Sequence, residues 1–185
     1  LRAIPNMEII VPADNFETRE AVKAAAASSK PFYIKFGKKK MPHLHKEGDP
    51  ITIGKASTII DGDQVAFIAC GETVAPAAEA AQLLDKLGIS ARVISMHTIK
   101  PLDSEAIIKA ARECKAVISV EEHSINGGLG EACASSILES GISVPFMRMG
   151  IPDEETVTGS QIEIFNHYGI SGKGLCQKAL DLLKP

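Results

Sequence analysis

The chain has 185 residues, 45% of them hydrophobic and 23% charged, a composition that excludes a disordered or a fibrous protein. Aromatic residues make up only 4% and Trp is absent, which predicts an aliphatic core and argues against a protein that stacks single-stranded nucleic acid on aromatic side chains. Residues 1–46 carry nine Lys/Arg and four Asp/Glu, whereas residues 47–185 carry eleven and nineteen. This split of the net charge of −3 indicates two units with different surfaces, and the basic excess is too small and local for a nucleic-acid-binding protein.

The sequence predicts a cytoplasmic protein with no membrane anchor. Its start at Leu1 has no signal-peptide pattern, and no segment approaches the roughly 18 apolar residues of a membrane span. We expect this start to be a cut through a longer protein. The spacings of the four cysteines fit no zinc or thioredoxin pattern, so buried free thiols in a reducing compartment are expected. The cysteines are Cys70, Cys114, Cys133 and Cys176.

Residues 1–46 are expected to form an incomplete strand–helix–strand unit followed by a linker. Apolar runs predict strands at 8–11 and 32–36, and either Asp14 or Asn15 can cap the helix between them. The second strand should end at the following glycine, because glycine ends regular structure at low cost.

The linker is predicted over residues 38–50, which hold two prolines, many charges and no periodicity. The basic cluster at its start, residues 38–40, could bind a phosphate as a set of point charges or could simply be a solvated face. His43 and His45 would share one face if this segment were a strand. No third ligand is near them in the sequence, so no metal site is predicted.

Residues 47–185 alternate strands with helices, the pattern of a doubly wound sheet. Strands are predicted at 51–60, 65–70, 91–96, 116–120 and 144–149. Helices are predicted at 73–87, from a cap at Asp103, from the glycine loop after residue 126 to about 140, at 160–167 and at 171–183. The expected fold class is α/β: a three-layer, five-stranded, mostly parallel sheet with one antiparallel edge strand, preceded by a truncated βαβ remnant.

Three polar residues, Glu121, Glu122 and His123, follow a predicted central strand. Open parallel sheets bind ligands at the carboxyl ends of their strands, and two carboxylates with an imidazole could transfer protons there. The alternative is that these polar side chains mark the exit of the strand into solvent or an interface.

A glycine loop, with Gly127, Gly128 and Gly130, joins that strand to the next helix. Glycines allow a tight turn, and a helix N-terminus attracts anions. The spacing does not fit the dinucleotide fingerprint and the loop follows a late strand, so a structural turn is favoured over a nucleotide-binding site.

The order of several short motifs is more specific than any one of them. Residues 2–7 (RAIPNM), 11–14 (VPAD) and 33–38 (YIKFGK) resemble the end of the pyrimidine-binding domain of transketolase-type thiamine diphosphate enzymes. The C-terminal domain of that superfamily is resembled by residues 99–103 (IKPLD), 120–130 (VEEHSINGGLG), 150–153 (GIPD) and 168–170 (YGI). The resemblance is closest to split transketolases, whose C-terminal half is a separate polypeptide.

The resemblance implies two domains: residues 1–46 as the end of the pyrimidine-binding domain with its linker, and residues 47–185 as the transketolase C-terminal domain. The parent enzyme would transfer a two-carbon ketol unit between sugar phosphates, in the pentose phosphate pathway, through thiamine diphosphate with Mg²⁺. The catalytic glutamate and the residues that hold the cofactor would all precede Leu1. The chain would therefore hold no catalytic, cofactor-binding or metal-binding residue and would be inactive alone.

On the substrate side, the resemblance assigns a phosphate contact to Lys38, at a position where the family usually has Arg. Lysine supplies charge there without a planar fork of donors. The implied partners are an N-terminal transketolase section or subunit, a second copy in a homodimer, and sugar phosphates. In the family the C-terminal domain packs the dimer and has been regarded as a possible regulatory site. Glu121, Glu122, His123 and the glycine loop are then interface or regulatory residues.

Three alternatives remain open from the sequence. The first is the corresponding part of a deoxyxylulose-phosphate synthase or of the β subunit of a 2-oxoacid dehydrogenase. The second is a non-catalytic assembly or regulatory module. The third is a nucleotide-binding Rossmann domain, an alternative that is supported only by the glycine loop.

Overall fold

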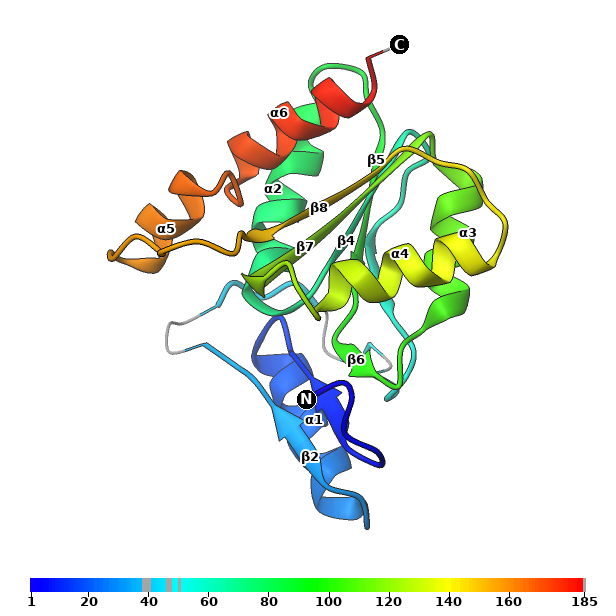
Figure 1. Cartoon of the computed structure of the whole chain (residues 1–185), viewed down its shortest axis with the longest axis vertical. Helices are drawn as coiled ribbons and strands as arrows, with labels where there is room; N and C mark the ends of the chain where they lie inside the picture. The colour runs from blue at the N-terminus through cyan, green and yellow to red at the C-terminus, as the bar shows by residue number, and fades with distance from the viewer. Residues whose placement is uncertain (38–40, 46–47, 50, 185) are drawn as a thin grey trace.

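A computed structural model describes residues 1–37, 41–45, 48–49 and 51–184, and contains a smaller and a larger β-sheet (Figure 1). The predicted boundary between residues 46 and 47 lies outside the described residues and stays a prediction.

The larger sheet has the strand order β3 (Ser57–Ile60), β5 (Ala91–Ser95), β4 (Val65–Ala69), β7 (Ala116–Ser124) and β8 (Phe146–Ile151). β4 pairs in parallel with β5 and β7, and β7 pairs in parallel with β8. β3 pairs antiparallel with β5 at the edge. The predicted five-stranded, mostly parallel sheet with one antiparallel edge strand is confirmed.

Helices cover both faces of this sheet and give the predicted three layers. On one face lie α2 (Val74–Asp85) and α6 (Gly172–Leu182), and on the other α3 (Ser104–Glu113) and α4 (Leu129–Glu139) (Figure 1). β4 is buried along its whole length between two largely aliphatic clusters, as a continuous apolar strand must be. None of the helices in the described part of the chain has the length and apolar character needed to cross a membrane.

The predicted strand–helix–strand unit is also confirmed. β1 (Glu8–Ile10) and β2 (Phe32–Ile34) pair in parallel, joined by α1 (Asn15–Ala27). Asp14 is the N-cap of α1, because its carboxylate accepts a hydrogen bond of 2.9 Å from the backbone amide of Glu17.

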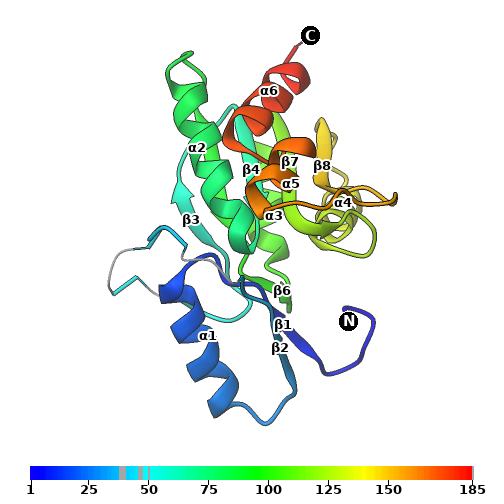
Figure 2. The same cartoon turned by 90° about the vertical axis from the view of Figure 1, so that its left-hand side faces the viewer.

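A strand that the sequence did not predict, β6 (Thr98–Lys100), completes the smaller sheet. β6 follows β5 in the chain but pairs antiparallel with β1 rather than with a strand of the larger sheet. Figure 2 shows the smaller sheet at one end of the molecule, with α1 beside it and β6 reaching into it from the larger unit. Backbone bonds from Val11 N to His97 O (2.7 Å) and from Gly71 N to Val11 O (2.9 Å) reinforce this junction.

Several strand predictions were wrong in extent. The strand predicted over 32–36 ends at Ile34, and the one predicted over 144–149 is β8, Phe146–Ile151. The predicted strand over 51–60 begins only at Ser57, because Gly54 has a positive φ of 82° and the Lys55 amide closes a turn onto the Thr52 carbonyl. The strand predicted to end at residue 120 continues to Ser124, so the polar residues assigned to its exit lie within β7.

All four cysteines are free and buried, as predicted. Burial raises the pKa of the Cys70 and Cys133 thiols far above the usual range. Neither thiol is therefore an activated nucleophile.

A helix α5 (Gln161–His167) precedes α6 and begins with a capping box at Ser160.

Candidate functional site

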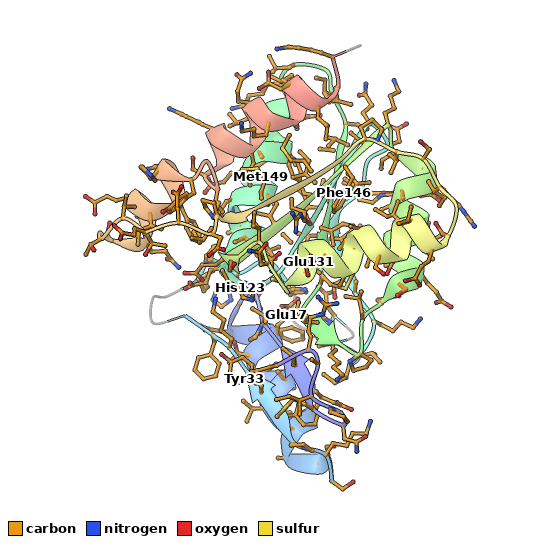
Figure 3. All side chains as sticks on the ribbon, viewed as in Figure 1. Glu17, Tyr33, His123, Glu131, Phe146 and Met149 are labelled. Carbon is orange, nitrogen blue, oxygen red and sulfur yellow. The ribbon has the colours of Figure 1, made fainter. Side chains whose placement is uncertain are left out.

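A cavity of about 160 Å³ lies where the carboxyl ends of β4 and β7 face the smaller sheet. Glu121, Glu122, His123, Gly127 and Gly128 all line it, so most of the sequence-predicted candidates come together. The other lining residues are Leu1, Arg2, Ile9, Val11, Tyr33, Lys35, Cys70, Glu72, Ile99 and Leu129. Figure 3 shows His123 at the end of β7 that is nearer to β2, the strand that carries Tyr33.

The carboxylate of Glu121 is occupied by hydrogen bonds within its own chain. Its side chain is 2% exposed, and its two carboxylate oxygens accept the backbone amides of Leu129 at 2.8 Å and Gly130 at 2.9 Å. These amides belong to the first turn of α4, where the helix has no internal acceptor for them and where its dipole favours a negative charge. Glu121 is therefore the cap of α4.

The glycine loop is a turn shaped around that cap. Gly127 has a positive φ of 75°, a conformation that favours glycine. A Cβ atom at Gly128 would overlap the Glu121 carboxylate, and one at Gly130 would lie 2.8 Å from Ser119 Oγ. Arg2 donates to the carbonyl oxygens of Gly127 and Gly128, at 3.2 and 2.6 Å. The anion-attracting end of α4 is thus already occupied by a carboxylate.

A carboxyl pair, Glu72 and Glu122, lies beside this cap. Gln161 Nε2 donates to both carboxylates, at 3.0 Å to Glu122 Oε1 and in closer contact with Glu72 Oε2. Lys35 Nζ donates to the Glu122 carbonyl oxygen at 2.9 Å and lies 3.4 Å from its carboxylate. Of these four residues, sequence reasoning named only Glu122 as a site candidate. It missed Lys35, Glu72 and Gln161, although Glu72 lies in a glycine turn that resembles the one after β7.

The two carboxyl groups of the pair have opposite pKa shifts. Burial, together with the neighbouring carboxylate of Glu122, raises the pKa of Glu72 to about 7 against the opposing effects of Gln161 and Lys35. Burial also acts to raise the pKa of Glu122, but hydrogen bonds with Glu72, Gln161 and Lys35 outweigh it and lower that pKa. The pair therefore holds one proton, on Glu72, at mildly acidic pH, and loses that proton around neutral pH.

A second buried cluster forms around His45. Residues 41–45 contain no strand, in keeping with the predicted linker, and His43 is exposed. His45 is almost fully buried between two carboxylates, with Nδ1 at 3.1 Å from Asp14 and Nε2 at 3.2 Å from Glu17. Ser95 Oγ donates to the same Glu17 carboxylate at 2.7 Å. The cluster ties residues 41–45 to the start of α1.

The charges of this cluster stabilise one another. Burial acts to lower the pKa of His45, but hydrogen bonds and charge interactions with Asp14 and Glu17 raise it to about 10. Burial acts to raise the pKa of Asp14, yet its bonds to His45 and to backbone amides hold that pKa well below the usual range. His45 is therefore a buried imidazolium at neutral pH.

The cavity does not fit the diphosphate of thiamine diphosphate. Three of its lining side chains, Glu72, Glu121 and Glu122, carry carboxyl groups. The arginine and the lysine that line it are already bonded within the chain, Arg2 to the Gly128 carbonyl oxygen and Lys35 to Glu122. The volume is also below the roughly 300–1,000 Å³ that small-molecule sites occupy. Lys38, the predicted phosphate contact, lies outside the described residues.

The comparisons with known proteins agree on one family. The family model described as "Transketolase, C-terminal domain" matches residues 54–175. One of the subunits of an apulose-4-phosphate transketolase from Phocaeicola vulgatus is 43% identical over 185 residues, which are 100% of this chain and 59% of that protein. A 1-deoxy-D-xylulose-5-phosphate synthase from Thermomicrobium roseum is 33% identical over 186 residues, with 99% of this chain and 30% of that protein covered.

A solved structure described as "Split gene transketolase, inactive beta4 tetramer" has a TM-score of 0.88 to this chain at 36% identity. The likeness covers 99% of this chain and 60% of that one, so the chain spans less than two thirds of the relatives it resembles. The resemblance seen in the sequence motifs is confirmed: the chain belongs to the transketolase C-terminal domain family and is the C-terminal section of a transketolase-like enzyme.

Proposed function

We propose that this chain is the C-terminal part of an enzyme that transfers a two-carbon ketol unit between sugar phosphates in the cytoplasm, as in the pentose phosphate pathway. The observation that carries the proposal is the 43% identity, along the whole chain, to one of the subunits of an apulose-4-phosphate transketolase. Thiamine diphosphate with Mg²⁺ supplies the carbanion chemistry when bound, and we assign its binding to other parts of the enzyme because the Arg2 and Lys35 cations of this cavity are already bonded within the chain.

The proposed partners are an N-terminal transketolase section or subunit and a second copy of the assembled enzyme. The related split transketolase is described as inactive in its β4 tetramer, which supports the view that such a subunit is inactive without its partner. Within this chain, Glu122 and His123 would be interface or regulatory residues at the junction of the two sheets. Glu121 and the glycines shape the turn before α4.

The first prediction concerns reconstitution. The full-length protein mixed with its N-terminal partner, thiamine diphosphate and Mg²⁺ is expected to cleave a ketose phosphate and transfer two carbons to an aldehyde. Xylulose 5-phosphate and apulose 4-phosphate are the donors to compare, with chromatographic detection of the products. The chain without its partner should show no turnover. Turnover by the isolated chain, or none by the assembled enzyme, would contradict the proposal.

The likeness to a 1-deoxy-D-xylulose-5-phosphate synthase favours a second candidate function. The same reconstituted enzyme would then form 1-deoxy-D-xylulose 5-phosphate from a 2-oxo acid donor, and this product separates the two candidates directly.

The second prediction concerns Lys38. In the assembled enzyme, Lys38→Ala is expected to raise KM for a phosphorylated donor roughly tenfold, because a charge-assisted phosphate contact is worth on the order of 1.4 kcal/mol or more. Lys38→Arg should retain or lower KM, since guanidinium adds a bidentate fork. Lys30→Ala is the matched control, because it removes the same charge from an exposed ion pair with Glu8. Equal KM values for the Lys38→Ala and Lys30→Ala enzymes would remove Lys38 from the phosphate site.

A further inference from the structure

Glu72 lies at a point where three parts of the chain meet. Its side chain comes from the turn before α2 and is in contact with Glu122 of β7 and with the amide of Gln161, the first residue of α5. It also lies against Gly37, in the segment that follows β2, so closely that a Cβ atom there would overlap the carboxyl group. One side chain thus joins the larger sheet, the start of α5 and the end of the smaller sheet.

The segment after β2 has a second attachment at the same place. Lys35 Nζ donates to the Glu122 carbonyl oxygen at 2.9 Å and lies 3.4 Å from its carboxylate. The two side chains of this ion pair are 35% and 29% exposed, so the pair contributes little by itself. The Lys35 amide donates to Ile10 O at 2.9 Å, which continues the β1–β2 pairing past the end of β2.

Two carboxyl groups face one cation in this cluster. Among the residues that the structure describes, Lys35 is the cation that interacts with Glu72 and Glu122. The Cys70 thiol beside them stays neutral, because burial raises its pKa far above the usual range. Tyr33 lines the cavity from β2. The other ionisable side chains nearby have partners elsewhere: Glu121 the α4 amides, Arg2 the Gly127 and Gly128 carbonyl oxygens, His123 the Ser124 carbonyl oxygen, and Glu163 of α5 the Ser160 cap.

The charge balance of the cluster therefore depends on a single proton. With that proton on Glu72, the pair carries one negative charge, which Lys35 balances. Without it, two like charges are in contact, and Glu72 is only 7% exposed, so water cannot relieve the repulsion unless the side chain moves. Movement away from Glu122 would also break the contacts of Glu72 with Gly37 and Gln161, whereas Lys35 would stay attracted to Glu122.

We propose that Glu72 forms a pH-sensitive latch at the junction of the two sheets. When protonated, Glu72 holds the segment after β2 and the start of α5 against β7; when ionised, it moves away from Glu122 and releases both. The pKa of about 7 at Glu72 sets this change near neutral pH. The latch requires neither substrate nor cofactor, so it is tested independently of the proposed function.

Hydrogen exchange of the full-length protein, followed by mass spectrometry and corrected for the intrinsic effect of pH on exchange, tests the latch. Two amides report on its two sides: that of Lys35, bonded to Ile10 O, and that of Ile164, bonded to Ser160 O at 3.0 Å. In the wild type, the protection of both is expected to fall roughly fivefold between about pH 6 and about pH 8, as Glu72 loses its proton. The amides of β4, at the centre of the larger sheet, are the internal reference.

The Glu72→Gln variant cannot ionise and keeps a hydrogen-bond donor, so the protection of its two reporter amides should not change with pH. Glu79→Gln is the matched control, because it removes an exposed carboxyl group from the helix that follows Glu72 and should keep the wild-type fall. A fall of equal size in the wild type and in Glu72→Gln, or a fall in neither, would overturn the proposal.

A second variant keeps the test decisive if Glu72→Gln does not fold. In Glu122→Gln, the ionised Glu72 would face a neutral amide instead of a like charge, so the fall in protection should be smaller than in the wild type. A fall of full wild-type size in Glu122→Gln would also overturn the latch.

Urea unfolding separates titration of Glu72 from opening of the latch. Because the pKa of Glu72 is raised in the folded protein, the wild type should lose stability relative to Glu72→Gln as pH rises from the ordinary value of 4.5 to about 7. Loss of stability together with the fall in protection supports the latch. Loss of stability while both amides keep their protection would mean that Glu72 titrates in place, and the latch would be overturned.

Discussion

Replacing Glu121 with Ala is expected to lower the free energy of unfolding by about 2–4 kcal/mol, because it removes the side chain that caps α4. The carboxylate accepts two amides of the first turn of α4, and its removal leaves both without an acceptor in a buried site. A charge-assisted bond of this kind contributes about 1.5–3 kcal/mol, and the relief of a buried charge offsets part of the sum. Urea unfolding followed by circular dichroism measures the change.

Two further variants test whether the cap is the cause. Glu121→Gln keeps one acceptor oxygen but places an NH₂ donor against a backbone amide. Its free energy of unfolding should therefore lie between those of the wild type and Glu121→Ala. Glu131→Ala removes a carboxylate from the same helical turn, where it is half-exposed beside Arg148, and should change stability by less than about 1 kcal/mol. Equal losses for Glu121→Ala and Glu131→Ala would show that the helix end is stabilised by something other than this cap.

The second large effect is expected at His45. His45→Gln should lower the free energy of unfolding by about 3 kcal/mol near pH 6, because it leaves the carboxylates of Asp14 and Glu17 buried without their cation. His43→Gln is the matched control, since His43 is exposed in the same segment and should change stability by less than about 0.5 kcal/mol. A His45→Gln protein as stable as His43→Gln would mean that the cluster contributes nothing net.

The pH dependence of this effect has a defined sign. Because the pKa of His45 is raised to about 10 in the folded protein, its contribution is complete below the unfolded value of 6.5 and is lost as pH rises toward 10. The lowered pKa of Asp14 has the opposite sense: its contribution is present above the ordinary value of 3.8 and is lost at lower pH. The stability difference between wild type and His45→Gln should therefore shrink from pH 6.5 upward. Unfolding curves across that range measure it.

The elements that the sequence predicted well are those whose signal is local. β4 is a run of five buried apolar residues, and the cap of α1 lies next to the helix it begins. The larger sheet could be predicted because strand and helix patterns alternate along the sequence. β6 was missed because three residues carry no periodicity, and its partner β1 lies far away in the sequence.

The candidate site could be predicted only in part for the same reason. Glu121, Glu122 and His123 were found because they follow a buried run on one strand. Their roles depend on partners from other elements, and no spacing rule pairs Glu122 with Glu72 or with Gln161. The buried state of His45 was also out of reach, because it is set by carboxylates that lie some thirty residues earlier.

The position of β6 has a consequence for synthesis of the protein on the ribosome. The edge of β1 that β6 covers cannot be paired until residues 98–100 have been made, long after the residues of β1 and β2 have been synthesised. At roughly 5–20 residues per second, this edge stays open for several seconds. An unpaired strand edge is a template for pairing with other chains, so this interval is the period in which the nascent protein is most exposed to aggregation or to capture by a chaperone.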